Sequence, residues 1–288
     1  MTTKTSLSTE RRSRLPRPTV AGVIATILLI VSLGTAFLGP IFRPHDPNAL
    51  VAAPMLGPSL EYPLGTDEIG RDIFSRVLSG GFDVVMISLL ATVVAFTIGA
   101  ALGMAAGYVQ GRFDLAVTRS VDLLIALPPL LLAIVFISSF GSSLLVLVVV
   151  TSAFFVPRII RIVRGVTVPV VANDYVKASR LRGLGTIAIL WRDLVPNVAG
   201  ILVVEFAARL GSVIMFIATL NFLGLGAQPP SSNWGLMVSE TLFLLRTNPA
   251  APLTATALIA ALTVGVSLFA DEFAARQSMN QLAGRSAT

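Results

Sequence analysis

The sequence contains no cysteine and only one histidine, His45. The absence of cysteine excludes disulfides, thiolate zinc sites and cysteine nucleophiles. One histidine leaves little room for a histidine-based metal site or a serine–histidine mechanism, and we expect His45 to be a solvated surface residue. Only two lysines are present, and neither Lys4 nor Lys177 follows a glycine as a P-loop lysine does. A process driven by ATP would therefore need another chain to bind the nucleotide.

Charged residues are also scarce, at 12% of 288 residues, whereas a typical soluble domain has about 25%. Hydrophobic residues make up 55% and gather in runs long enough to cross a bilayer. These runs lack the alternation that is typical of a transmembrane β-barrel. The sequence therefore predicts an all-α polytopic membrane protein. Most of the net charge of +6 comes from alternate loops, which is a topology signal, so we expect no nucleic-acid partner.

The apolar runs predict six transmembrane helices, over residues 19–42, 84–109, 121–140, 144–158, 198–223 and 252–273. Small residues between Gly99 and Gly107 favour close packing of the second helix against a neighbour. Residues 110–120 are expected to form a short turn, and Pro128-Pro129 to kink the third helix. The predicted organisation is an N-terminal tail, a first span, an external segment with a short amphipathic helix, a five-helix core and a C-terminal tail, over residues 1–18, 19–42, 43–82, 83–275 and 276–288.

Six spans place both termini on one side of the membrane. Lys and Arg concentrate in the segments that a cytosolic N-terminus would place inside, whereas the outer segments hold only Arg43, Arg71, Arg76 and Arg246. By the positive-inside rule we expect both termini to lie in the cytosol.

A polar, basic stretch over residues 174–197 interrupts the apolar chain on the side predicted to be cytosolic. Asn173 or Asp174 can cap a two-turn helix over residues 175–182, with Gly183 as a left-handed C-cap. Thr186 can cap a second short helix that ends before Pro196. The residues themselves leave two interpretations open: a docking surface for a soluble partner, or a juxtamembrane loop attracted to anionic lipid.

Glu205 and Arg209 are four residues apart within the fifth predicted span. Charges inside a membrane face a bundle interior or a wet cavity. They can form a mutual structural pair, or they can line a path through the membrane or contact a second membrane chain.

Two outer stretches also contain clustered turn and charged residues. In residues 62–81, Thr66 or Asp67 is expected to start a short helix, with Asp72 and Arg76 as an i,i+4 pair. In residues 222–237, we expect glycines to turn the backbone, Pro229-Pro230 to end the helix, and Trp234 to lie at the membrane–water interface. Capping of the bundle and contact with an external partner or solute both remain open.

The 174–197 stretch resembles the EAA loop of binding-protein-dependent ABC importer permeases. The resemblance implies a coupling helix seated in a groove of an ATPase subunit. The family's usual glutamate is replaced by Lys177; with Asp174 as N-cap, this lysine would stand at N3, where it cannot complete a capping box. The residues to which the resemblance assigns coupling are Asp174, Tyr175, Lys177, Ala178, Ser179, Arg182, Gly183, Leu194, Pro196 and Asn197.

Both outer stretches resemble segments of the dipeptide, oligopeptide and nickel permeases of the DppC/OppC type, so that the resemblance covers about residues 16–275. The residues that carry it are Gly65, Thr66, Asp67, Gly70, Arg71, Asp72, Arg76, Gly224, Gly226, Pro229, Pro230, Trp234 and Gly235.

The resemblance implies a type I ABC importer permease in the plasma (inner) membrane, forming half of a translocation pathway for di- or oligopeptides, or alternatively for nickel or another small solute. It implies a second, DppB/OppB-type permease, two cytosolic ATPase subunits that use ATP and Mg, and an external solute-binding protein. The chain itself would bind no cofactor or metal and would not be an enzyme. The Glu205/Arg209 pair keeps open a different class, a stand-alone secondary transporter.

Overall fold

The computed structural model describes residues 19–285, so the predicted N-terminal tail, residues 1–18, and the last three residues lie outside it. Within that range the fold is all-helical, with two isolated β-bridges in the segment after the first helix. Five helices are long and apolar enough to cross a membrane: α1 (Val20–Phe42), α3 (Gly81–Val109), α6 (Leu144–Val171), α9 (Val195–Phe222) and α11 (Ala250–Arg285). A sixth span is obtained if the bent pair α4 (Gly111–Ala126) and α5 (Pro129–Phe140) is counted as one.

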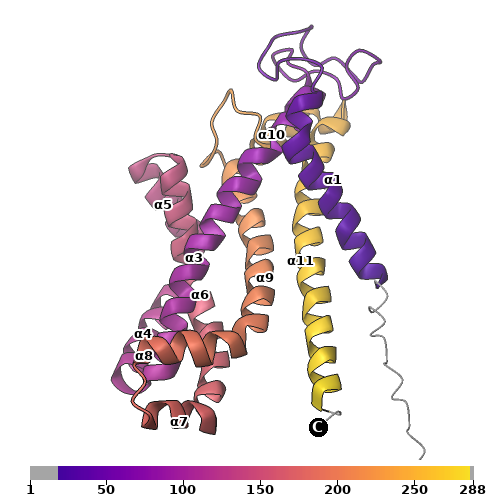
Figure 1. Cartoon of the computed structure of the whole chain (residues 1–288). Helices are drawn as coiled ribbons and strands as arrows, with labels where there is room; N and C mark the ends of the chain where they lie inside the picture. Colours follow the sequence, from indigo (N-terminus) through magenta and orange to yellow (C-terminus); the bar gives the residue numbers. More distant parts are fainter. Residues whose placement is uncertain (1–18, 286–288) are drawn as a thin grey trace, which may run out of the picture.

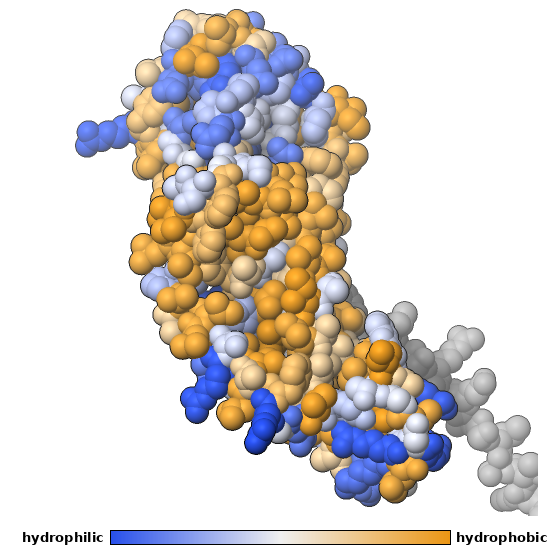
Figure 2. All heavy atoms as spheres, turned by 90° about the vertical axis from the view of Figure 1, so that its left-hand side faces the viewer, coloured by the Kyte–Doolittle hydropathy of each residue, from blue (hydrophilic) through white to orange (hydrophobic). Residues whose placement is uncertain are grey.

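Apolar side chains form a band around the middle of the molecule. Figure 2 shows hydrophobic residues gathered there and hydrophilic residues at the two ends of the visible face. In Figure 1, residues 43–72 and α10 (Trp234–Thr241) lie at one end, and α7 (Asp174–Leu181) and α8 (Thr186–Ile189) at the other. This distribution and the long apolar helices make the chain a multi-pass membrane protein.

The most extensive helix–helix packing is between α3 and α6, which meet through the small residues of α3. A Cβ built on Gly99 would lie 2.7 Å from the Cβ of Ile159, and one on Gly103 would lie 2.9 Å from the Cβ of Val163. The contacts repeat one helical turn later at Gly107. Only residues without a side chain allow this approach, so the predicted close packing is confirmed.

The prediction of one kinked helix over residues 121–140 was wrong, because the structure has two separate helices there. The expected turn over residues 110–120 is reduced to Gln110, which has φ 57°, and α4 starts at Gly111. Instead of a kink, the Pro128-Pro129 pair separates α4 from α5, whose axes differ by 84°. The reason is local: a residue before proline avoids the helical region, and Leu127 and Pro128 are both extended.

The predicted fourth helix, residues 144–158, was too short. The apolar run ends near Arg158, but α6 continues to Val171. Two of its arginines find acids on α4, with 2.6 Å between Arg161 Nη2 and Asp122 Oδ1, and 2.7 Å between Arg164 Nη2 and Asp114 Oδ2. Because these cations are paired and the helix packs on α3, the helix does not stop where hydrophobicity does.

Three further boundaries differ from the prediction. Helix α11 continues to Arg285, so most of the expected tail over residues 276–288 is helical. The segment after α9 contains α10 and the short 3₁₀ helix η2 (Leu242–Arg246), where only an outer segment was expected. The short helix of the first external segment, α2 (Ile73–Ser79), starts later than Thr66 or Asp67.

The core has two main apolar clusters. One lies among α3, α5, α6 and α9. The other joins α1 and α11 with α2, α9 and α10. Helix α9 contributes to both and also contacts α11, so it connects the two halves of the bundle.

Candidate functional site

The predicted short helix of the polar stretch is present as α7, displaced by one residue from residues 175–182. Gly183 has φ 75°, and its N–H donates to the Arg180 carbonyl at 2.9 Å. The Leu184 N–H donates to the Ser179 carbonyl at 3.2 Å, which completes a Schellman motif. The predicted left-handed C-cap at Gly183 is therefore confirmed.

Of the two N-cap residues that the sequence offered, Asn173 occupies the position, although its side chain makes no hydrogen bond to the helix. Asp174 is the first helical residue, so the arrangement with Asp174 as N-cap was wrong. Lys177 is thus at N4, not at the N3 position of a capping box. Its Nζ lies 3.0 Å from Asp174 Oδ1 in a pair with both side chains exposed, so the two residues compensate each other on the surface.

One face of α7 holds the stretch against the ends of the spanning helices. Val176 and Ser179 are buried, and the Arg180 guanidinium lies 4.2 Å from the centre of the Tyr108 ring while donating to the Tyr108 carbonyl at 3.1 Å. Val176 belongs to a small apolar cluster of five buried residues: Tyr108, Val171, Val176, Ile189 and Leu194. Ser179 and Leu194, two of the residues assigned to coupling, therefore face the protein interior.

The same stretch also exposes large apolar side chains, of which only Tyr175 was among the residues assigned to coupling. Leu181 is 89% exposed, Ile187 72% and Trp191 70%, with Tyr175 also exposed. Such residues in an otherwise polar stretch were the available sequence signal, because large apolar groups left in water mark contact surfaces.

The second half of the stretch does not end at Pro196. Gly185, not Thr186, stands at the N-cap of α8, which continues through the π-helical turn η1 (Leu190–Leu194) into α9. In the wider turn, the N–H of Val195 donates to the Leu190 carbonyl. The side-chain amide of Asn197 donates to the Asp193 carbonyl at 2.7 Å. The helix therefore continues through Pro196, although this residue has no backbone N–H to donate.

Glu205 and Arg209 contact each other on α9. Arg209 Nε lies 2.7 Å from Glu205 Oε1, and both side chains are largely buried. Each charge thus has an opposite charge beside it, as membrane burial requires. A role in lining a pathway or in contacting another chain stays a prediction.

The outer stretches assemble with residues 43–61 and 238–249 into a compact unit over residues 43–80 and 223–249, here named the cap. Its centre is a buried charge network. Arg76 Nη2 lies 2.7 Å from Glu240 Oε2, and Arg71 Nε lies 2.5 Å from Asp67 Oδ2. Arg71 also approaches Glu240, at 3.5 Å, and Arg76 approaches Asp67, at 3.8 Å. Burial raises the pKa of Glu240 although both arginines oppose the shift.

The predicted Asp72–Arg76 pair was wrong. Asp72 is the N-cap of α2, and its carboxylate accepts from the backbone N–H groups of Phe74 and Ser75, each at 3.1 Å. His45 is not simply solvated: its Nδ1 lies 3.3 Å from Asp72 Oδ2. Thr66 donates to the Ala53 carbonyl at 2.7 Å, and the turns at Gly65 and Gly70 have positive φ.

Trp234 joins the two outer stretches and is enclosed by protein, whereas the sequence favoured a side chain exposed to the membrane–water interface. It is fully buried, and its Nε1–H donates to the Val77 carbonyl at 2.7 Å. A Cβ on Gly80 would lie 1.8 Å from the Ser232 carbonyl oxygen, and one on Gly81 would lie 2.4 Å from the Trp234 ring. The two resembling stretches, far apart in the chain, therefore form one interlocked structure.

Other residues of the second outer stretch also have structural positions. Gly224, with φ 72°, ends α9 in a Schellman motif, so the helix stops before the cis Pro229-Pro230 bond and not because of it. Gly226 and Gly235 lie against Asn221, too close for a side chain at either position.

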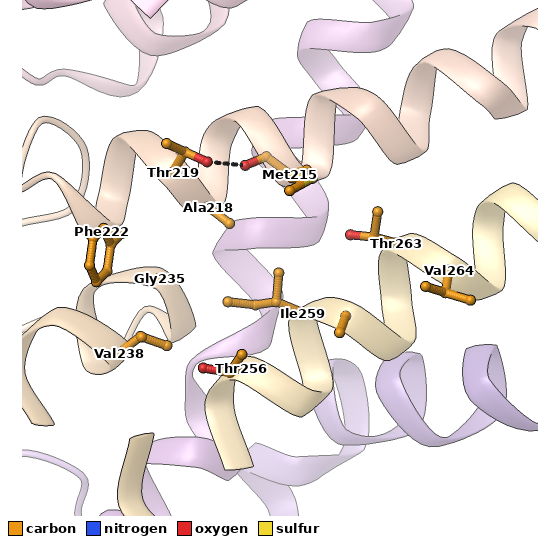
Figure 3. Close-up of a pocket in the computed structure, with 11 residues that line it drawn as sticks. Met215, Ala218, Thr219, Phe222, Gly235, Val238, Thr256, Ile259, Thr263 and Val264 are labelled. Carbon is orange, nitrogen blue, oxygen red and sulfur yellow. Dashed lines mark hydrogen bonds between the residues drawn. The ribbon is translucent and has the colours of Figure 1, made fainter. Parts of the chain in front are cut away.

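A mostly apolar cavity of about 380 Å³ lies among α9, α10 and α11. Figure 3 shows Met215 and Thr219 of α9 on one side and Ile259 and Thr263 of α11 on the other. Gly235 of the cap also lines it, so this cavity lies beside the cap.

Comparison with known proteins gives a consistent family. The model of the family described as "Binding-protein-dependent transport system inner membrane component" matches residues 97–278. The chain is 36% identical over 220 residues to the glutathione transport system permease protein GsiD of Pectobacterium atrosepticum, covering 76% of this chain and 73% of the relative.

Two further relatives agree. GsiD of Escherichia coli O6:K15:H31 is 38% identical over 236 residues, or 80% of this chain and 76% of its own. The probable D,D-dipeptide transport system permease protein DdpC of Escherichia coli K12 is 33% identical over 219 residues, or 76% and 74%. The residues matched by the family model include the second half of α3 and the whole of α6, α7 and α9, and the chain therefore belongs to the family of binding-protein-dependent transport system inner membrane components.

Proposed function

We propose that this membrane permease component forms half of the translocation pathway of an ATP-driven importer for di- or oligopeptides. In this proposal α4 and α5 form one broken span, which gives six spans with both termini in the cytosol. A second related permease, two cytosolic ATPase subunits that use ATP and Mg, and an external binding protein complete the complex. The peptide cargo is supported by the relatives, which are named for glutathione and D,D-dipeptide transport. Nickel or another small solute is the alternative.

The observation that carries the proposal is the two-sided construction of residues 174–194. The packed side is fixed to α3 and α6 by the contact of Arg180 with Tyr108 and by the buried Val176. The exposed side offers large side chains to a partner, namely Tyr175, Leu181, Ile187 and Trp191. A surface built this way transmits displacement, because pushing on the exposed side moves the spanning helices through the packed side.

The transmission then continues into α9 through a helical segment from Thr186 to Phe222 that has no loop but bends between α8 and α9 (Figure 1). Closure of the ATPases would thus tilt α9, and with it Glu205 and Arg209, toward or away from the pathway. The alternative of lipid contact for this stretch predicts that ATP-driven peptide uptake does not depend on the geometry of α7.

Substitution of Gly183 by proline tests the coupling assignment. Proline fixes φ near −65°, whereas Gly183 has φ 75° and donates a backbone hydrogen bond, so the C-cap cannot form. In the complex isolated through this chain and reconstituted in proteoliposomes, we expect G183P to retain ATP hydrolysis but to lose most peptide uptake.

Gly185→Pro is the matched control, since Gly185 already has φ −65° and an open surrounding. It should preserve uptake. Normal peptide uptake by G183P would contradict the docking assignment. Uptake of nickel and not of peptide by the wild-type complex would show that the proposed peptide cargo is wrong.

A further inference from the structure

Helix α6 presents three arginines at successive turns, and two of them are neutralised within the chain. Arg161 lies 2.6 Å from Asp122, and Arg164 is held by both oxygens of Asp114. In the described part of the chain, Arg158 has no carboxylate within ion-pair distance. Its guanidinium carbon instead lies 5.8 Å from the centre of the Phe155 ring. An aromatic face leaves the guanidinium N–H donors free for another partner.

Arg158 lies at the middle of α6, one of the helices long and apolar enough to cross a membrane. It is about 21 Å along α6 from Leu144, at the usual helical rise. Because the apolar run ends near Arg158, the sequence assigned this residue to the cytosolic loop. Helix α6 nevertheless continues to Val171. A cation at this depth is costly unless it faces protein or a wet cavity.

The side chain of Arg158 lines a cavity of about 290 Å³ among α5, α6 and α9. On α9 the cavity is lined by Ser212, Met215, Phe216 and Thr219, of which Ser212 and Met215 are exposed. Because Thr219 is three residues from the outer end of α9, the cavity lies away from the cytosolic surface, and Arg158 does not simply reach toward the inner headgroups.

The composition of the cavity suits a small amphipathic anion. The guanidinium supplies paired donors that match a carboxylate. The Ser212 and Thr219 hydroxyls donate to the Ala208 and Met215 carbonyls, so they are left as acceptors for the N–H groups of a peptide. Phe155 and Phe216, in edge contact with 5.9 Å between ring centres, give an apolar wall for a side chain. Met215 and Thr219 also line the cavity beside the cap, so the two cavities adjoin on one face of α9.

We propose that Arg158 binds the C-terminal carboxylate of the peptide as it passes through the membrane, within the cavity formed with Ser212, Phe216 and Thr219. This inference rests on the proposed peptide cargo. The competing arrangement is an ion pair between Arg158 and an acidic residue of the second permease, in which Arg158 would hold the two permeases together and would not distinguish one peptide terminus from another.

The experiment measures equilibrium binding of a tripeptide and of its C-terminal amide to the complete complex in nanodiscs, without the external binding protein. The two ligands differ only in the carboxylate. We expect the wild type to prefer the acid by about tenfold, equivalent to about 1.4 kcal/mol. Arg158→Gln should remove this preference by weakening acid binding while leaving amide binding nearly unchanged.

Arg161→Gln is the matched control, because Arg161 lies one turn away on α6 and is already paired with Asp122. It should keep the preference for the acid. Arg158→Lys, which retains the charge but loses the two-pronged geometry, should weaken acid binding less than Arg158→Gln does.

The outcomes separate the two proposals. If the wild-type complex transports no peptide in proteoliposomes, the proposed function itself fails. If it transports peptide but has no preference for the acid, or if acid and amide binding fall together in Arg158→Gln, the carboxylate site is overturned and pairing with the second permease is favoured. Should Arg158→Gln fail to assemble, acid affinity in Arg158→Lys equal to that of the wild type overturns the site as well.

Discussion

The two ends of the molecule place the same kinds of residues in opposite environments. In the cap, Arg71, Arg76 and Trp234 are buried and find their partners within the chain. In residues 174–194, Leu181 and Trp191 are exposed, and Lys177 pairs with Asp174 only on the surface. The cap is thus complete in the isolated chain, whereas the 174–194 segment has one finished side and one open side. The difference indicates that the open side needs a partner.

Removing one arginine from the cap should have the largest effect on the stability of the isolated chain. Arg76→Leu leaves Glu240 with only the more distant Arg71, and breaking a buried pair costs about 3–5 kcal/mol. Thermal unfolding of the purified chain in detergent measures the loss. Arg43→Leu, an exposed cation of the same segment, should change stability by less than about 0.5 kcal/mol. Equal effects would show that the cap does not depend on its network.

The two tryptophans offer an intermediate and direct comparison, since Trp234 lies in the cap and Trp191 in the 174–194 segment at the other end of the molecule. Trp234→Phe removes a buried hydrogen bond and should cost about 1–3 kcal/mol, whereas Trp191→Phe should be nearly neutral. Fluorescence of the single-tryptophan variants provides an independent measurement. Trp234 should emit at short wavelength and resist aqueous quenchers, and Trp191 should be quenched readily until a partner covers it. A protected Trp191 in the isolated chain would contradict an open surface.

Lys177→Glu should have the smallest effect. The Lys177–Asp174 pair is exposed and contributes at most about 1 kcal/mol, and because Lys177 is at N4 the change completes no capping box. Unfolding of the isolated chain should therefore shift by less than about 0.5 kcal/mol. ATPase activity of the assembled complex is the sharper measurement, because a lysine matched to an acidic partner residue would weaken docking when replaced. A large gain in the chain's own stability would restore the capping-box interpretation.

Local signals in the sequence predicted local structure well. The first span starts at Thr19 as the N-cap and ends at Phe42, as the apolar run indicates. Gly183 ends α7 because a glycine after a short helix takes a positive φ without strain. The glycines of α3 indicated close packing, although they did not name α6 as the partner.

Features that depend on distant residues were not predicted. Arg76 was assigned to its neighbour Asp72, yet its partner Glu240 lies 164 positions along the chain. Trp234 was assigned to the bilayer interface because its character suits that place, but the carbonyl of Val77 and the space left by Gly81 bury it. The fourth helix was predicted to end near Arg158 because the apolar run ends there. Hydrophobicity along the chain carries no information about Asp114 and Asp122 of α4, which pair with the later arginines of α6.

The sequence by itself determined the class of the protein, most of its spans and the capped helix of the 174–194 segment, because long apolar runs and helix-ending residues act through nearby backbone. Tertiary structure alone decided which charges are neutralised inside the chain and which are left for others. Arg71, Arg76, Arg161 and Arg164 find acids on other elements or across the cap, and Arg158 faces an open cavity. The physical reason is that the cost of a charge in a membrane protein is set by what surrounds it in space, which spacing along the chain does not specify.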